Sequence, residues 1–211
     1  MKTWAPLNCK THFSLLKGFC RCNSLAAKCK EYGYAACGIA DIGTISGAVD
    51  FHQSCKKEGI KPILGCDLIK YVSTQDVDTL KLIAEHGNVI CVSSDANGLQ
   101  KLFKNNHVDW SCHDHEVFYV DKEDAECHRV MLCSGMKTNL KKVAKKIKDQ
   151  EELENEKFFL KDDWYLPTPE ESKEFDDSQI LNKIINMCED YELNEKPMLP
   201  HYDCPQGLSE D

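Results

Sequence analysis

Cysteine and histidine are the residues of this chain that could bind a metal ion through nitrogen and sulfur. One group combines Cys112, His113, Asp114 and His115 with the Cys-His pair at 127–128, and another is built on the Cys-x-Cys pair at 20–22. Zinc fingers and ribbons use paired knuckles such as CxxC, and neither group has that spacing. We therefore expect no finger or ribbon, and Cys112, His113 and His115 are the best candidates for a zinc site.

The chain has 13 cysteines in 211 residues. Such a count suggests disulfides in a secreted protein, but the first twelve residues lack the apolar stretch of a signal peptide. We expect a cytoplasmic protein with reduced thiols. Six cysteines fall at apolar positions of the predicted helices and strands, where we expect small core residues: Cys29, Cys37, Cys55, Cys66, Cys133 and Cys188.

Composition excludes several functions. The chain has 35 acidic and 26 basic residues, a net charge of −9, so we expect no strong independent binding of nucleic acid. No apolar run is long enough to span a membrane. Motifs of P-loop, Rossmann and serine-hydrolase proteins are missing from the sequence. His12 and His128 are expected to be exposed.

The first third of the sequence predicts a βαβ unit. A helix is expected at 23–32 and a short buried strand at 35–40. A second helix is expected from Thr44 to Gly59, and a second buried strand at 62–66. Strand, helix and strand at this spacing favour a parallel sheet or barrel.

The rest of the chain gives weaker signals. Strands are expected at 80–84 and 89–92 and helices at 98–104, 121–135, 141–148 and 178–191, with a helix start at 168–171, while 105–116 resists assignment. The basic segment 141–148 is followed by the acidic segment 151–156. We interpret these two as a solvated helix and its turn rather than a binding site.

Three sequence blocks resemble a known family. THFSLLKG at 11–18, ADIGTISGAVDF at 40–51 and GIKPILGCD at 59–67 are similar, in order and spacing, to the opening blocks of the PHP (polymerase and histidinol phosphatase) domain. Three later blocks, at 118–128, 164–171 and 196–207, are similar to bacterial C-family replicative polymerases. The resemblance, over about 7–207, is therefore to the PHP domain of the DNA polymerase III alpha subunit family.

The resemblance implies an α/β fold, a distorted seven-stranded βα barrel. Between the helix at 98–104 and the strand at 117–120, however, this chain is several dozen residues shorter than the family. We expect a truncated PHP-type barrel over 1–135, with a helical C-terminal part, 136–211, packed on the same core. Open strand edges would be covered by a partner or by self-association into a homo-oligomer.

The resemblance also implies a metal site, and here the chain departs from the family. Members hold up to three metal ions with His, Asp, Glu and Cys ligands. The residues at five ligand positions do not match: Asn8, Lys10, Ile42, Thr79 and Phe118. Carboxylates remain at three positions, namely Asp41, Asp67 and Glu116. Since an ammonium group cannot ligate a metal, we expect Lys10 to pair with Asp41 or Asp67, and we expect no metal cofactor.

Two functions follow from the resemblance. The first is a catalytically inactive PHP-like protein that acts by protein binding in DNA replication, as a split-off or mimic N-terminal piece of a C-family polymerase in a phage or small replicon. Its partner would be the replicative polymerase or a proofreading exonuclease subunit. The alternative is a metal-dependent phosphoesterase or 3′–5′ exonuclease that uses Asp41, Asp67 and Glu116 with Zn, Mn or Mg. We expect no polymerase activity from this chain alone.

Overall fold

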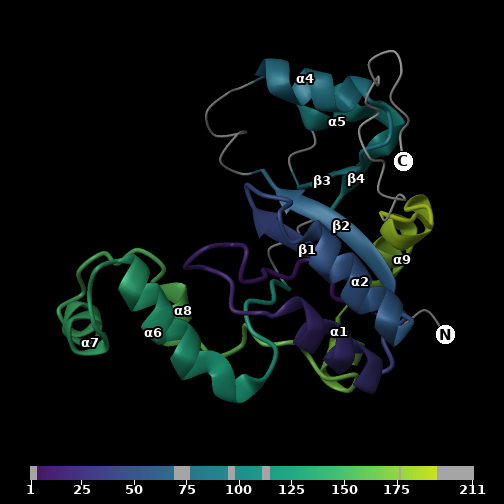
Figure 1. Ribbon diagram of the computed structural model, residues 1–211. Helices are drawn as coiled ribbons and strands as arrows, with labels where there is room; N and C mark the ends of the chain where they lie inside the picture. Colours follow the sequence, from purple (N-terminus) through teal and green to yellow (C-terminus); the bar gives the residue numbers. More distant parts are fainter. Residues whose placement is uncertain (1–3, 69–76, 95–97, 111–114, 176, 194–211) are drawn as a thin grey trace, which may run out of the picture.

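The structure of the chain is a computed structural model that describes residues 4–68, 77–94, 98–110, 115–175 and 177–193. It has mixed α and β content, with helices gathered around short parallel strands (Figure 1). Within the described ranges, no helix has the length and apolar character needed to cross a membrane.

The first half of the chain contains the predicted strand–helix–strand unit. β1 (Ala36–Ile42) and β2 (Lys61–Asp67) pair in parallel and are connected through α2 (Ala48–Glu58). β1 is buried over most of its length because its side chains are small or apolar. Gly59 ends α2 with a φ of 71°, in the left-handed region that glycine adopts without strain.

A second helix lies against this unit. α1 (Cys22–Glu31) packs along α2, and Figure 1 shows the two side by side. Its buried side chains, Leu25, Ala26 and Cys29 among them, lie on one face at helical spacing. The predicted helix at 23–32 is therefore confirmed within one residue at each end.

Parallel pairing continues beyond β1 through single bridges. Cys9 forms parallel bridges with Ile39 on β1 and with Val117, and Tyr119 forms one with Tyr165. The resulting parallel order is β2, β1, the segment around Cys9, the segment from Val117 to Tyr119, and then Tyr165. Because these segments are parallel, their carboxyl-terminal ends lie along the same edge of the paired segments. The truncated barrel stays a prediction.

The middle of the chain corrects one expectation. Residues 80–84 are not a strand but part of helix α4 (Val77–Glu85). Alternation would have placed Leu80 and Leu82 on the same face, whereas in the helix Leu80 is buried and Leu82 is exposed. The strand expected at 89–92 is β3 (Cys91–Ser93).

The partner of β3 comes from the segment that resisted assignment. β4 (His107–Asp109) pairs with β3 in parallel, and α5 (Leu99–Phe103) and the 3₁₀ turn η1 (Lys104–Asn106) connect the two strands. The helix expected at 98–104 is thereby confirmed. Three residues are too few for β4 to show an alternating pattern.

The described chain from Lys122 to Met187 is mostly helical. Its helices and turns are η2 (Lys122–Asp124), α6 (Ala125–Gly135), α7 (Leu140–Lys148), α8 (Lys157–Leu160), η3 (Glu171–Glu174) and α9 (Ser178–Met187). The helix expected to reach Tyr191 ends at Met187. The helix start at 168–171 forms its reciprocal cap, in which Thr168 N donates to Glu171 Oε2 at 2.8 Å, but only a 3₁₀ turn follows.

Two apolar clusters form the core. The larger one joins N-terminal residues such as Phe51 to Leu181 and Ile184 of α9, and the smaller one surrounds Phe118 and Phe158. The larger cluster thus draws on residues from both sides of the boundary at 135, and the division of the chain there stays a prediction.

The cysteines largely pack as apolar side chains. The larger cluster contains six buried cysteines: Cys9, Cys20, Cys22, Cys29, Cys37 and Cys55. Of the six predicted core cysteines, Cys133 is buried too, whereas Cys66 and Cys188 are half-buried. Burial raises the pKa of Cys22 to about 12, so this thiol stays protonated at neutral pH. The described cysteines are all free thiols.

Candidate functional site

A buried lysine lies where the parallel segments meet. The side chain of Lys10 is 1% exposed, and its ammonium group donates to Asp67 Oδ2 at 2.9 Å and to Ala40 O at 2.6 Å. Glu116 Oε1 lies 4.0 Å from the same nitrogen. The ion pair expected for Lys10 is therefore formed with Asp67. A buried cation needs such partners because its hydration is lost.

Asp41, at the end of β1, is fully buried and is held by hydroxyl groups rather than by Lys10. Thr11 donates twice, from N to Oδ1 at 2.6 Å and from Oγ1 to Oδ2 at 2.7 Å. Ser14 Oγ donates to Oδ1 at 2.6 Å and accepts a hydrogen bond from Ile42 N. Both carboxylate oxygens thus have short hydrogen bonds, which tie the loop after Thr11 to the end of β1.

Glu116 lies between two lysines. Its Oε1 faces Lys10, while Oε2 lies 3.3 Å from Lys157 Nζ. Lys157 is half exposed, and its Nζ lies 4.6 Å from the ring centroid of Trp164. Lysine ammonium groups thus lie beside the carboxylates of Asp67 and Glu116, and hydroxyl groups donate hydrogen bonds to the carboxylate of Asp41.

We next asked whether these residues fit the metal centre that the resemblance implies. A metal ion beside Asp67 and Glu116 would have to share their oxygens with the Lys10 ammonium group, which would repel it. Asp41 already accepts three hydrogen bonds. Across the described residues, no group of three His, Cys, Asp or Glu side chains is arranged to hold a metal ion. The described residues at this site therefore do not fit a bound metal ion.

Four further residues stand at positions where the family has metal ligands, and each has its own surroundings. Asn8 is buried, and Ile42 is partly exposed at the end of β1. Thr79 lies on α4. Phe118 is buried in the smaller apolar cluster, with its ring 4.6 Å from that of Phe158. None of these four residues carries an imidazole, thiolate or carboxylate group, the ligand types that the family uses.

The candidate zinc residues are only partly described. Cys112 and His113 lie outside the described residues. His115 stacks on Phe175 with a centroid distance of 3.9 Å, and its Nε2 lies 3.7 Å from Asp177 Oδ2. These contacts place His115 in an aromatic environment near the larger core cluster.

The two histidines expected to be exposed differ. His12 is exposed, as predicted. His128 is buried, and its Nε2 lies 2.7 Å from Lys17 O, so the expectation of an exposed side chain is wrong. Burial lowers the pKa of His128, so the neutral ring that donates to Lys17 O is favoured. The aromatic rings around α6 provide the apolar surroundings that the helical pattern did not reveal.

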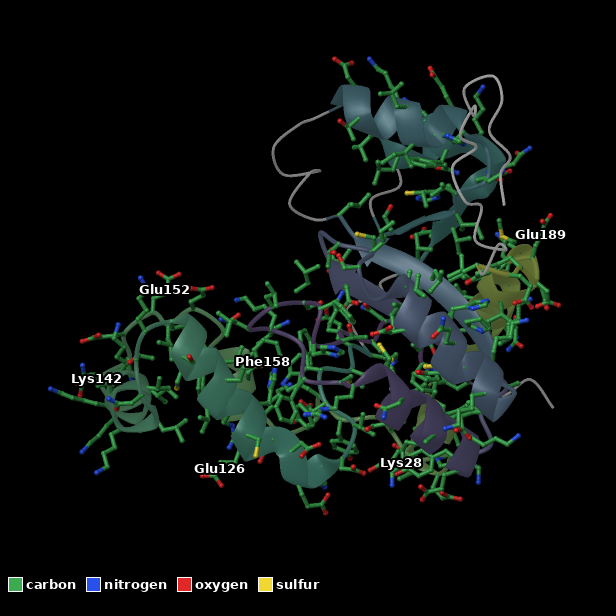
Figure 2. The ribbon with its side chains drawn as sticks, in the orientation of Figure 1. Lys28, Glu126, Lys142, Glu152, Phe158 and Glu189 are labelled. Atoms are coloured by element: carbon green, nitrogen blue, oxygen red, sulfur yellow. The ribbon has the colours of Figure 1, made fainter. Side chains whose placement is uncertain are left out.

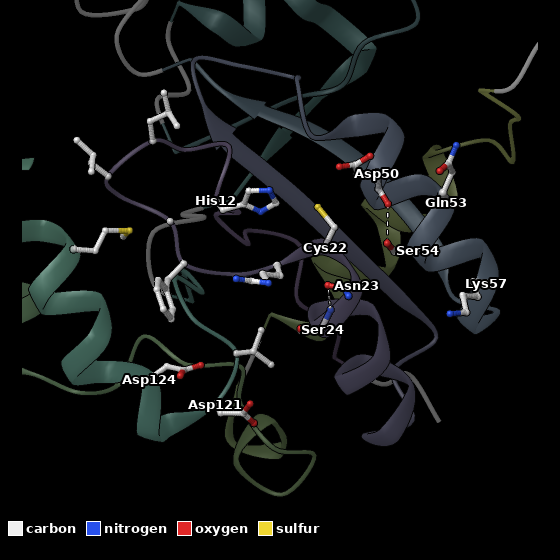
Figure 3. Close-up of a pocket in the computed structure, with 17 residues that line it drawn as sticks. His12, Cys22, Asn23, Ser24, Asp50, Gln53, Ser54, Lys57, Asp121 and Asp124 are labelled. Carbon is white, nitrogen blue, oxygen red and sulfur yellow. Dashed lines mark hydrogen bonds between the residues drawn. The ribbon is translucent and has the colours of Figure 1, made fainter.

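A groove of about 1130 Å³ opens beside the loop at 12–19. Figure 3 shows Asp50 and Lys57 of α2 on one side of it and Asp121 and Asp124 on the other, with His12 between them. Leu15, Leu16, Phe19 and Met131 add apolar surface to its lining. The groove therefore combines apolar and charged side chains, as protein-binding surfaces commonly do.

Sequence reasoning missed three residues of the site. Thr11 and Ser14 hold Asp41, and Lys157 pairs with Glu116 from α8. The spacing of Thr11 and Ser14 within the block at 11–18 was the available signal, because hydroxyls three residues apart can reach one acceptor in a tight turn. For Lys157, 41 residues beyond Glu116, the sequence contains no comparable signal.

The parallel segments define an α/β domain in which the buried Lys10 ammonium group lies beside Asp67 and Glu116. The PHP domain family matches residues 6–158, and the chain belongs to this family.

Three proteins similar to this chain are DNA polymerase III alpha subunits. The chain is 44% identical over 66 residues to the DNA polymerase III subunit alpha of Chlamydia muridarum, and 35% identical over 111 residues to that of Aquifex aeolicus. These matches cover 31% and 49% of this chain but only 5% and 9% of the two polymerase subunits. The subunit of Helicobacter pylori strain 26695 is 33% identical over 101 residues, which are 48% of this chain and 8% of that protein.

Proposed function

We propose that this chain is a non-catalytic PHP domain that acts in DNA replication by binding a protein of the replication machinery. The observation that carries the proposal is Lys10, whose buried ammonium group lies among the carboxylates that the family uses for metal ions. Asp67 and Glu116 are thereby engaged in ion pairs, so they cannot activate water through a bound metal. The likeness to DNA polymerase III alpha subunits supports the replication context.

An apolar surface at the edge of the site supports a binding role. We define the loop patch as five exposed aliphatic residues in the loop after Thr11, at the end of β1, in the loop after β1 and at the start of α2: Leu15, Leu16, Ile42, Ile45 and Val49. Leu15 is 81% exposed and Ile45 is 70% exposed. The two loops adjoin, since Phe13 lies against Gly47. Exposed aliphatic side chains gathered in this way are typical of protein-binding surfaces.

The partner that we propose is the replicative polymerase or its proofreading exonuclease. The test is affinity capture from native lysate of the source cell with the full chain as bait, followed by mass spectrometry. We expect a polymerase subunit or an exonuclease to be captured by the native chain and lost with the L15D/I45D variant. The control is L82D, because Leu82 is 66% exposed on α4 and outside the loop patch.

Two outcomes would overturn the proposal. One is capture that contains no replication protein under conditions that keep complexes intact. The other is metal-dependent hydrolysis of single-stranded DNA or p-nitrophenyl phosphate by the purified native chain with Mn²⁺, Mg²⁺ or Zn²⁺. The second result would favour the phosphoesterase alternative, and its loss in a D41N variant would assign the activity to this site.

A further inference from the structure

Positive charge is concentrated on one short stretch of this acidic chain. Residues 137–148 contain six lysines and no acidic residue: Lys137, Lys141, Lys142, Lys145, Lys146 and Lys148. Most of them belong to α7. The net charge of the whole chain is −9, so this stretch departs sharply from the average of the surface.

The lysines are displayed on a helix that is fixed in place. Asn139 caps α7, since its side chain accepts a hydrogen bond from Lys142 N at 3.0 Å. Val143 is 2% exposed, Leu140 and Ile147 are half-buried, and α7 packs against α6, so most of the apolar face of α7 is covered. The six lysines are exposed, and Figure 2 shows Lys142 at the outer side of α7, away from the strands.

Most of this charge has no ion-pair partner. Among the described residues, Lys146 alone of the six forms an ion pair, with Glu151 at 3.8 Å. The acidic segment at 151–156 does not neutralise all of these lysines. Its Glu154 forms an ion pair with Lys17 instead, at 3.0 Å. Unpaired like charges on one helix repel one another, and an anionic ligand would relieve that repulsion.

We propose that the lysine face of α7 binds the phosphate backbone of nucleic acid without reading its sequence. Lysines act as flexible point charges suited to phosphates, and the stretch has no arginine that could form bidentate contacts with bases. The nine residues of α7 span about 13 Å, which matches about four phosphates of one DNA strand at 3.4 Å per step. A membrane surface fits less well, because most of the apolar face of α7 is covered.

This surface is separate from the protein-binding role proposed above. It is expected to hold nucleic acid weakly and only near α7, because the rest of the chain is acidic. Bound to a partner in replication, the chain would then contribute a local cationic contact to a larger complex. Its test does not depend on capture of any partner.

The experiment measures fluorescence anisotropy of a fluorescein-labelled 24-base-pair duplex of mixed sequence titrated with the full chain. We expect saturable binding at 50 mM KCl that weakens steeply by 200 mM, with a slope of log K against log salt of about −2 to −4. The K141E/K142E/K145E variant should bind at least about ten-fold more weakly. In the K141Q/K142Q/K145Q variant the slope should become shallower by up to about 0.9 for each phosphate that the chain no longer neutralises.

The matched control reverses three exposed lysines away from α7. The K30E/K101E/K104E variant has the same net charge as K141E/K142E/K145E, and far-UV circular dichroism checks that both are folded. We expect the control to bind within about two-fold of the native chain at 50 mM KCl, where screening limits the reach of distant charges. Equal loss of binding in both variants, or no binding by the native chain, would overturn the assignment.

Discussion

Lys10 gives the site its chemical character. In a metal centre the cation can leave, but the ammonium group of Lys10 is covalently part of the chain and is buried at 1% exposure. It draws Asp67 and Glu116 toward one point and reaches the carbonyl of Ala40 on β1. We interpret this cluster as a structural link between the parallel segments that carry these residues.

The first residue-scale prediction concerns the K10M substitution. Methionine has a similar length but no charge, so K10M removes the ammonium group that lies between the Asp67 and Glu116 carboxylates. Removal of one partner from a buried ion pair typically costs about 3–5 kcal/mol of unfolding free energy. We expect a loss of this size in urea denaturation followed by circular dichroism.

Two variants serve as controls for K10M. In K10M/D67N/E116Q the two carboxylate charges are removed as well, so most of the lost stability should return. K157M removes the half-exposed partner of Glu116 and should cost about 1 kcal/mol or less. Native-like stability of K10M would show that the buried ion pair contributes little to the fold.

For single residues, the sequence predicted ion pairing better than it predicted hydrogen-bond partners and burial. The pairing of Lys10 with a nearby carboxylate followed from the resemblance, which places Lys10, Asp41 and Asp67 at ligand positions of the family, and from the inability of an ammonium group to bind a metal. The role of Thr11 did not, since hydroxyl groups serve many local turns as well as long-range acceptors. The burial of His128 could not be predicted because the aromatic rings that pack against it come from segments up to thirty residues away in sequence, as Phe158 does.

At the scale of elements, the central feature is the close approach of parallel segments. A Cβ atom on Gly38 of β1 would lie 2.8 Å from both the Cα and the carbonyl oxygen of Leu7. These are backbone atoms, so they cannot move aside as a side chain would. Gly38 therefore sets the distance between β1 and the segment that carries Lys10.

The G38A substitution tests this arrangement. Forced separation of the two segments should cost about 1–3 kcal/mol of unfolding free energy, as overpacking of a core does, and should lower the midpoint of thermal unfolding. G98A is the matched control, because a Cβ atom at Gly98 meets nothing within 4 Å and its φ is negative. Equal midpoints for G38A and G98A would contradict the close packing described for β1.

Elements with strong local signals were the ones that sequence analysis found. α2 ends at a glycine, α6 follows an acidic first turn, and β1 is buried and apolar, whereas β2 is half-buried over most of its length. The parallel bridges of Cys9 could not be predicted, because one bridged residue leaves no periodic pattern. The strand prediction for residues 80–84 is wrong because a short apolar run fits a buried strand as well as a helix.

For the molecule as a whole, one segment connects the two apolar clusters. Val117 and Val120 belong to the larger cluster, whereas Phe118 and Tyr119 between them belong to the smaller one. The segment is also hydrogen-bonded to a later part of the chain, since Phe118 N donates to Trp164 O at 2.8 Å. Loss of one cluster would therefore remove support from the other, and we expect the described parts of the chain to unfold as one unit.

Single-tryptophan variants test this expectation. Trp4 lies in the larger cluster, and Trp164 packs against the smaller one. W110F/W164F retains Trp4 as its fluorescent reporter, and W4F/W110F retains Trp164. In urea denaturation of each variant, we expect the fluorescence midpoint to coincide with that variant's own far-UV circular dichroism midpoint, because both clusters share the segment at 117–120.

A Trp164 signal that changes at clearly lower urea than the circular dichroism of the same variant would show instead that the smaller cluster unfolds separately. Comparison within each variant removes the effect that the phenylalanine substitutions have on stability.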